Sequence, residues 1–184
     1  MAKTTRYLAL LRGINVGGNN VIAKEDLKQC FEDLGCENVR TYIQSGNILF
    51  RNTSKSIRKL TGLIEKGLSQ RFDYAARAVV MSAAQYSAAI AASPDKWGQA
   101  DDQKHNALFT LSDITPEQVV SQLPPAKPNI ETVGVGPGVV FSSVSKKHLS
   151  KTTMMVLSKS STYKLLTVRN HNTVFKLQEL FATI

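Results

Sequence analysis

The residues best suited to chemistry gather where the apolar pattern breaks off. After the strand-like run from Tyr7 to Arg12, the segment LLRGINVGGNN places three glycines and three asparagines before the next helix. Glycine lets backbone N–H groups approach a ligand, and asparagine amides and an arginine guanidinium donate hydrogen bonds to anions and carbonyls. This connection takes about ten residues, whereas such loops usually take roughly two to six. The length favours a functional loop.

A second polar turn is expected beside this loop. The segment VRTYIQSGNILFR is typical of two strands around a Ser-Gly-Asn turn, which is a hairpin signal. If the strands before the loop and before the turn are parallel, both connections lie at one end of the sheet. We therefore predict one ligand-binding cluster of Arg12, Gly13, Asn15, Gly17, Gly18, Asn19, Gln44, Ser45, Gly46 and Asn47.

The same composition also suits a purely structural loop. Glycines permit positive φ, asparagines tolerate it, and two loops stapled together by hydrogen bonds would have the same sequence. Both interpretations stay open. A nucleotide P-loop is disfavoured, because Asn19 and Asn20 stand where a lysine and a Ser or Thr must reach phosphate and Mg²⁺. The three-glycine dinucleotide pattern is absent as well.

The second candidate surface is basic and lies near the C-terminus. The net charge is +9, and residues 144–184 hold seven Lys or Arg against one acid, Glu179. The segments SKKHLSK and VRNHNTVFK each follow a predicted strand, and the two strands are expected to run the same way. Helix N-termini there would add N–H donors for a phosphate or carboxylate. The predicted anion-binding residues are Lys146, Lys147, Lys151, Arg169, Asn170, Asn172, Thr173 and Lys176.

Residues for catalysis are few. His105, His148 and His171 lie in separate segments without metal-ligand spacing, so we expect neither a metal nor a cofactor. The two cysteines, Cys30 and Cys36, lack a nucleophile signature and are expected to be buried thiols. A Ser-His-Asp arrangement assembled across space stays open, and so does the question of enzymatic activity.

The hydrophobic pattern predicts the elements that position these residues. Strand, helix, strand, strand, helix, strand succeed one another twice, which is the ferredoxin-like unit. The fold class is therefore α+β, with two tandem ferredoxin-like (alpha-beta plait, βαββαβ) subdomains and a C-terminal helix. We predict subdomain 1 at residues 1–82, a helical and polar connector at 83–103, and subdomain 2 with the C-terminal helix at 104–184.

Composition sets the broad class. The apolar fraction is 42%, which is ordinary for a globular protein. No stretch approaches the roughly 20 apolar residues of a membrane span, and the N-terminal apolar run is too short for a signal peptide. A cytoplasmic protein without a membrane partner is the expectation.

Three long segments carry a family resemblance. YLALLRGINVGGNN, VRTYIQSGNILF and TVRNHNTVFKL resemble the hallmark segments of the bacterial domain-of-unknown-function-1697 family, and the likeness spans nearly the whole chain. It implies a cytoplasmic protein with two ferredoxin-like subdomains, and no established activity, cofactor or catalytic residue. The family usually has tryptophan where this chain has His171, which weakens any stacking role there. The hallmark positions are Arg12, Gly13, Asn15, Gly17, Gly18, Tyr42, Gln44, Ser45, Gly46, Asn47, Arg169, Asn170, Asn172, Thr173 and Lys176.

Three function classes follow from these observations. Binding of a small anionic or phosphorylated ligand is favoured, because paired loops rich in glycine and asparagine suit a compact ligand. A nucleic-acid-binding module is the first alternative, but the third strand of each unit offers a single aromatic residue, Phe50 or Phe141. A protein-interaction module is the second alternative.

Overall fold

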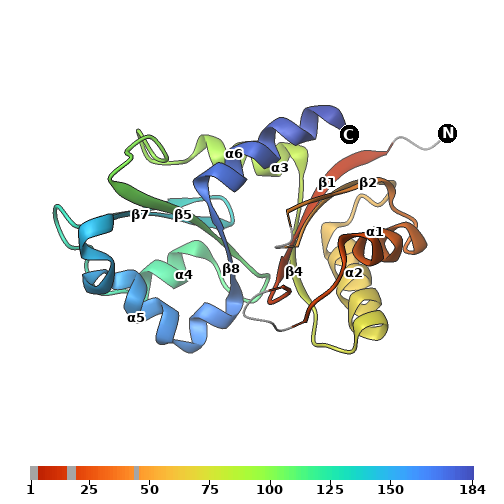
Figure 1. Cartoon of the computed structure of the whole chain (residues 1–184), viewed down its shortest axis with the longest axis horizontal. Helices are drawn as coiled ribbons and strands as arrows, with labels where there is room; N and C mark the ends of the chain where they lie inside the picture. Colours follow the sequence, from red (N-terminus) through yellow and green to blue (C-terminus); the bar gives the residue numbers. More distant parts are fainter. Residues whose placement is uncertain (1–3, 16–19, 44–45) are drawn as a thin grey trace. The chain divides into compact units, whose positions relative to one another are not determined.

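The first sheet of the computed structural model, whose strands β1, β2 and β4 are labelled in Figure 1, has the strand order β2-β3-β1-β4 and is antiparallel. The structure describes residues 4–15, 20–43 and 46–184. Both β1 and β2 run opposite to β3, so they are parallel to each other, as the element order predicted. The elements are β1 (Thr5–Arg12), α1 (Lys24–Asp33), β2 (Glu37–Tyr42), β3 (Asn47–Asn52), α2 (Ile57–Phe72) and β4 (Arg77–Ser82).

Helices α1 and α2 share one core with this sheet. Alternate residues of β1, namely Tyr7, Ala9 and Leu11, are buried in it, because successive strand side chains point to opposite faces. Each helix contributes an apolar stripe at helical spacing: Leu27, Cys30 and Phe31 from α1, and Leu60, Ile64 and Leu68 from α2.

The second sheet repeats this topology with the order β6-β7-β5-β8. Residues Leu108, Val119, Val140, Leu157 and Leu166 form a core between the sheet and its helices. The elements are β5 (Gln103–Thr110), α4 (Pro116–Ser121), β6 (Glu131–Gly136), β7 (Val139–Ser145), the 3-10 segment η1 (Lys146–Lys151), α5 (Thr153–Lys159), the 3-10 segment η2 (Ser161–Leu165) and β8 (Leu166–Asn170).

Two side chains define where the helices of the second sheet begin. Thr115 accepts a hydrogen bond from the backbone N–H of Gln118, whose side chain accepts from the Thr115 N–H, so α4 starts with a capping box. The buried carboxylate of Glu131 accepts hydrogen bonds from Thr152 and Thr153 at the start of α5.

The chain divides into two compact units, Met1–Tyr86 with Leu177–Ile184, and Ser87–Lys176. The unit boundaries fall within α3 (Ala83–Ala91) and α6 (His171–Leu180), and α6 is followed by the 3-10 segment η3 (Phe181–Thr183). Arginines of the first sheet bind the last residues: Arg6 Nη1 donates to the Phe181 carbonyl (2.6 Å) and Arg51 Nη2 to the Ile184 carbonyl (2.8 Å).

The predicted fold class is confirmed. Two four-stranded antiparallel sheets in the same order, each with its helices, form an α+β protein of two ferredoxin-like subdomains with a C-terminal helix. None of the helices built by the described residues is both long and apolar enough to cross a membrane.

Candidate functional site

Asn15 closes the loop that follows β1. Its Nδ2 donates to the Ile22 carbonyl (3.0 Å), and its Oδ1 accepts from the Ile22 N–H (2.8 Å). Asn20 Nδ2 donates to the Gly13 carbonyl (2.8 Å), and the Asn15 N–H donates to the Asn20 carbonyl (3.2 Å). Both asparagines have positive φ, +52° and +46°, which asparagine tolerates better than most residues. Asn15 therefore shapes the loop through bonds within the protein.

Gly46, in the turn between β2 and β3, lies directly against this loop. Its carbonyl accepts from the Leu11 N–H (2.8 Å), and a Cβ at this position would lie 2.8 Å from the Leu11 Cβ and 2.9 Å from the Ile14 Cδ1. Asn47 is buried and donates to the Tyr42 carbonyl (3.0 Å). Loop and turn are thus neighbours at Gly46, as chain direction predicted. The other predicted members, Gly17, Gly18, Asn19, Gln44 and Ser45, lie outside the described residues.

Arg12 and Gly13 lead from β1 into the loop. Arg12 is half-buried opposite Arg77, the neighbouring arginine on β4. Gly13 is exposed with φ +71°, a left-handed conformation that favours glycine. Neither residue is among the described residues that line the cavity beside the loop.

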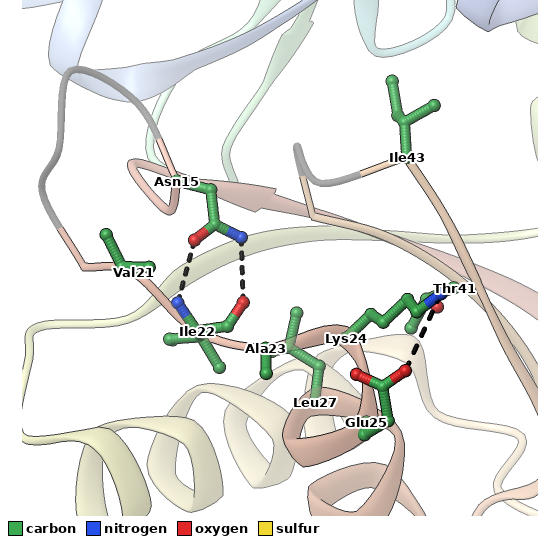
Figure 2. A pocket seen from close by; sticks show the side chains of 9 residues that line it. All are labelled: Asn15, Val21, Ile22, Ala23, Lys24, Glu25, Leu27, Thr41 and Ile43. Atoms are coloured by element: carbon green, nitrogen blue, oxygen red, sulfur yellow. Dashed lines mark hydrogen bonds and ion pairs between the residues drawn. The ribbon is translucent and has the colours of Figure 1, made fainter.

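That cavity lies between the loop, the start of α1 and the end of β2, with a volume of about 530 Å³ (Figure 2). Pockets for small molecules typically measure about 300–1,000 Å³ and are mostly apolar with a few polar groups. Val21 and Ile43 are 77% and 51% exposed, although both are apolar. The described lining residues are Asn15, Val21, Ile22, Ala23, Lys24, Glu25, Leu27, Thr41 and Ile43.

The N-terminal end of α1 lines part of the cavity. The N-cap residue is Ala23, which has no side-chain acceptor for the N–H groups of the first turn. Lys24 and Glu25 form an ion pair of 3.7 Å, and their side chains are 69% and 73% exposed. Such an exposed pair contributes little to stability, so Lys24 can exchange its partner at small cost.

A shallower hollow of about 270 Å³ adjoins the cavity and shares Lys24, Glu25 and Thr41 with it. Lys28 and Arg40 add two cationic groups there. Sequence reasoning predicted the loop and turn but missed Lys24, Thr41 and the two exposed apolar residues. The available signal was the segment VIAKED, which combines two apolar residues, a helix start without a capping side chain and a lysine.

The C-terminal basic residues emerge at one end of the second sheet, as predicted. Both β7 and β8 run opposite to β5, and Ser145 and Asn170 pair with Gln103 and Asn106 near its start. Lys147, Lys151, Asn172 and Lys176 are exposed, and Thr173 is buried.

Several of these side chains form hydrogen bonds within the protein. The Lys146 Nζ donates to the Asp101 carbonyl (2.6 Å), and the Asn170 Oδ1 accepts from the Thr173 N–H (2.9 Å). Buried Arg169 donates through Nη1 to the Thr167 Oγ1 (2.9 Å) and the Val168 carbonyl (2.8 Å).

The structure assembles a histidine cluster that the sequence did not indicate. The rings of His105 and His171 lie 5.3 Å apart, and both make edge contacts with Trp97. The His105 Nδ1 is 2.8 Å from the Ser143 Oγ, and its Nε2 is 3.1 Å from the Ala100 carbonyl. His105 and Ser143 are both buried, so this serine-histidine pair has the form of a structural hydrogen bond rather than of an accessible nucleophile.

Both thiols are buried and free, as predicted. Burial raises the pKa of Cys30 and raises that of Cys36 to about 11, although a hydrogen bond from Asn52 acts in the opposite direction on Cys36. Because the thiolate is the nucleophilic form, neither cysteine is activated for catalysis at neutral pH.

Fold and site together define an α+β protein of two ferredoxin-like subdomains with a cavity at the first strand–helix loop. The chain belongs to the family described as "Protein of unknown function (DUF1697)", whose model matches residues 4–141. Among solved structures it is similar to the conserved bacterial protein SP0830 from Streptococcus pneumoniae, with 28% sequence identity and a TM-score of 0.87 over 97% of this chain and 99% of that one. No curated protein matches the sequence.

Proposed function

We propose that this protein binds a small anionic or phosphorylated ligand in the cavity at the start of α1. The observation that carries the proposal is the cavity itself, about 530 Å³ in volume, with the ammonium group of Lys24 at its edge. Lys28 and Arg40 add two positive charges in the adjoining hollow, and Lys28 is paired with Glu32 at 3.7 Å. The first turn of α1 adds N–H groups that its N-cap residue leaves without a side-chain acceptor.

The second unit provides an internal comparison. Its first strand–helix connection ends in Thr115, and the capping box with Gln118 satisfies the Thr115 and Gln118 N–H groups at the start of α4. In the first unit the corresponding helix begins at Ala23 without such a cap, beside a cavity. The two units therefore differ at this helix start: a side chain caps α4, whereas no side chain caps α1. The N–H groups at the start of α1 suit a ligand.

The nucleic-acid alternative has less support. Phe50 is buried against Tyr7 and Phe31, and Phe141 is buried against Trp97, so neither ring offers a free face to a base. The exposed lysines of η1 still permit electrostatic binding. If the protein binds nucleic acid, its affinity should fall with rising salt concentration. Replacing Lys146, Lys147 and Lys151 together should then make this dependence weaker, by close to one unit in the slope of log affinity against log salt concentration for each lost phosphate contact.

Lys24→Gln tests the proposed site. Isothermal titration and NMR chemical-shift mapping of the intact protein would use inorganic phosphate, acetate and hexanoate as probes. Loss of a charge-assisted hydrogen bond predicts about a tenfold weaker affinity for the anions that bind. Lys66→Gln is the matched control, because Lys66 is an exposed lysine of α2 in the same unit.

The expected shift perturbations cluster on Ile22–Leu27 and on Thr41. Perturbations confined to residues 146–176 would move the site to the C-terminal face, and equal affinities of the Lys24 and Lys66 variants would refute the role of Lys24. Absence of binding by every anionic probe would refute the proposed function.

A further inference from the structure

Ile43 is held in a backbone conformation that its side chain disfavours. Its φ is +49°, in the left-handed region, where a β-branched residue is a genuine outlier. The side chain is also 51% exposed, so burial in the core does not compensate for the strain. Strained residues of this kind persist at ligand clamps and switches, where the conformation serves a function.

Val21, another apolar residue that lines the cavity, is exposed as well. Its side chain is 77% exposed, and Figure 2 shows Val21 and Ile43 on opposite sides of the cavity, with Ile22, Ala23 and Leu27 also lining it. Two large, exposed apolar side chains at the edge of a partly apolar cavity suit an apolar group of a ligand.

The charged residues indicate how many charges the ligand carries. Lys24 contributes one positive charge to the cavity, and Glu25 places a carboxylate 3.7 Å from it. A ligand with one negative charge balances the charge of Lys24, whereas Glu25 opposes a second negative charge in the cavity, because the further cations Lys28 and Arg40 line the adjoining hollow instead. Inorganic phosphate would in addition leave Val21 and Ile43 in water.

We propose that the ligand of this cavity is a small amphipathic anion whose single negative group binds Lys24 and whose aliphatic or aromatic group lies between Val21 and Ile43. This inference rests on the proposed function and narrows it to one class of ligand. Ile43 then determines specificity for the apolar part, and its conformational strain is retained because a less strained residue would lose that contact.

The test measures affinity for acetate, butyrate and hexanoate by titration of the intact protein, with hexanol and inorganic phosphate as comparisons. Each buried methylene should strengthen binding about threefold to fourfold. Ile43→Asn should weaken hexanoate binding about tenfold and leave acetate unchanged, while raising the melting temperature, because asparagine tolerates positive φ. Ile43→Gly repeats this test, and Val135→Asn, at an exposed valine of β6, is the matched control.

The outcomes separate the two proposals. Equal affinity for acetate, hexanoate and phosphate overturns the proposal that an apolar group of the ligand lies between Val21 and Ile43, and leaves the proposal of anion binding intact. If hexanol binds as tightly as hexanoate, Lys24 does not contribute to recognition, and the proposal of an anionic ligand is refuted. A lower melting temperature for both Ile43 variants shows that Ile43 stabilises the fold and overturns the strain argument. No binding of any anionic probe refutes both proposals.

Discussion

Replacement of Glu131 by glutamine should destabilise the second unit substantially. The Glu131 carboxylate is buried and accepts from the Thr153 N–H (2.9 and 3.0 Å), the Thr153 Oγ1 (3.0 Å), the Lys127 N–H (3.2 Å) and the Thr152 Oγ1. These donors join β6 to the start of α5, where an acidic group is also favoured by the helix dipole. The N-cap residue of α5, Thr152, accepts a hydrogen bond from the Met154 N–H (3.1 Å), and the Glu131 carboxylate from a distant strand adds an acceptor for the Thr153 N–H and both threonine hydroxyls.

The expected loss is about 2–3 kcal/mol in the free energy of unfolding. A hydrogen bond to a charged group contributes about 1.5–3 kcal/mol, and a buried donor left without an acceptor costs about 1–3 kcal/mol. Glutamine keeps one acceptor oxygen but directs an NH₂ group at donors, so at least one bond is lost. With about 2–4 °C per kcal/mol for a chain of this size, the melting temperature should fall by roughly 4–12 °C.

The pH dependence gives an independent check. Burial alone would raise the pKa of Glu131, but the hydrogen bonds from Thr152, Thr153 and Lys127 outweigh it and hold that pKa below its ordinary value. A carboxyl whose pKa is lowered in the folded state stabilises the protein above its ordinary pKa, and this contribution is lost as the pH falls through the lowered value. The difference between wild type and Glu131→Gln should therefore narrow below about pH 4.3.

Urea denaturation at pH 7 and at pH 3, followed by Trp97 fluorescence, measures both effects. Glu117→Gln, at an exposed acid in the first turn of α4, is the control and should change stability by less than about 1 kcal/mol. A Glu131→Gln variant as stable as this control at pH 7 would refute the reasoning. A difference that stays constant down to pH 3 would show that the carboxylate charge is not responsible.

Three further predictions concern Gly46, Asn15 and His105. Gly46→Ala should lower the free energy of unfolding by about 2–4 kcal/mol in urea denaturation, since alanine adds both positive-φ strain and a steric clash. Gly62→Ala, in open space within α2, should raise it by about 0.5–1 kcal/mol, because alanine favours a helix more than glycine does. Asn15→Ala should lower the melting temperature, because two hydrogen bonds are lost, worth about 1–3 kcal/mol together. Burial lowers the pKa of His105, so the free energy of unfolding should fall as the pH drops below about 6.5. Urea denaturation followed by Trp97 fluorescence should show this fall for the wild type and not for His105→Gln.

Local pattern was sufficient to predict the two ferredoxin-like units. Strand alternation and helical stripes report which faces are buried, and Leu60, Ile64 and Leu68, which recur at helical spacing in the sequence, lie in the core. Contacts between residues far apart in the chain leave no such periodic signal. The bonds of Arg6 and Arg51 to the last residues span 175 and 133 positions, and nothing in the sequence around either arginine indicates that partner.

The candidate site shows the same division. Glycine and asparagine mark backbone that must turn, so the sequence located the loop after β1 and the turn at Gly46. Residue type does not say where an amide points, and the Asn15 side chain points at its own loop, to Ile22. The cavity instead presents Lys24 and Ile43, one ordinary as a surface lysine and the other ordinary as a strand residue. What singles out Ile43 among the described residues with positive φ is its β-branched side chain, and the sign of φ is a property of the folded chain.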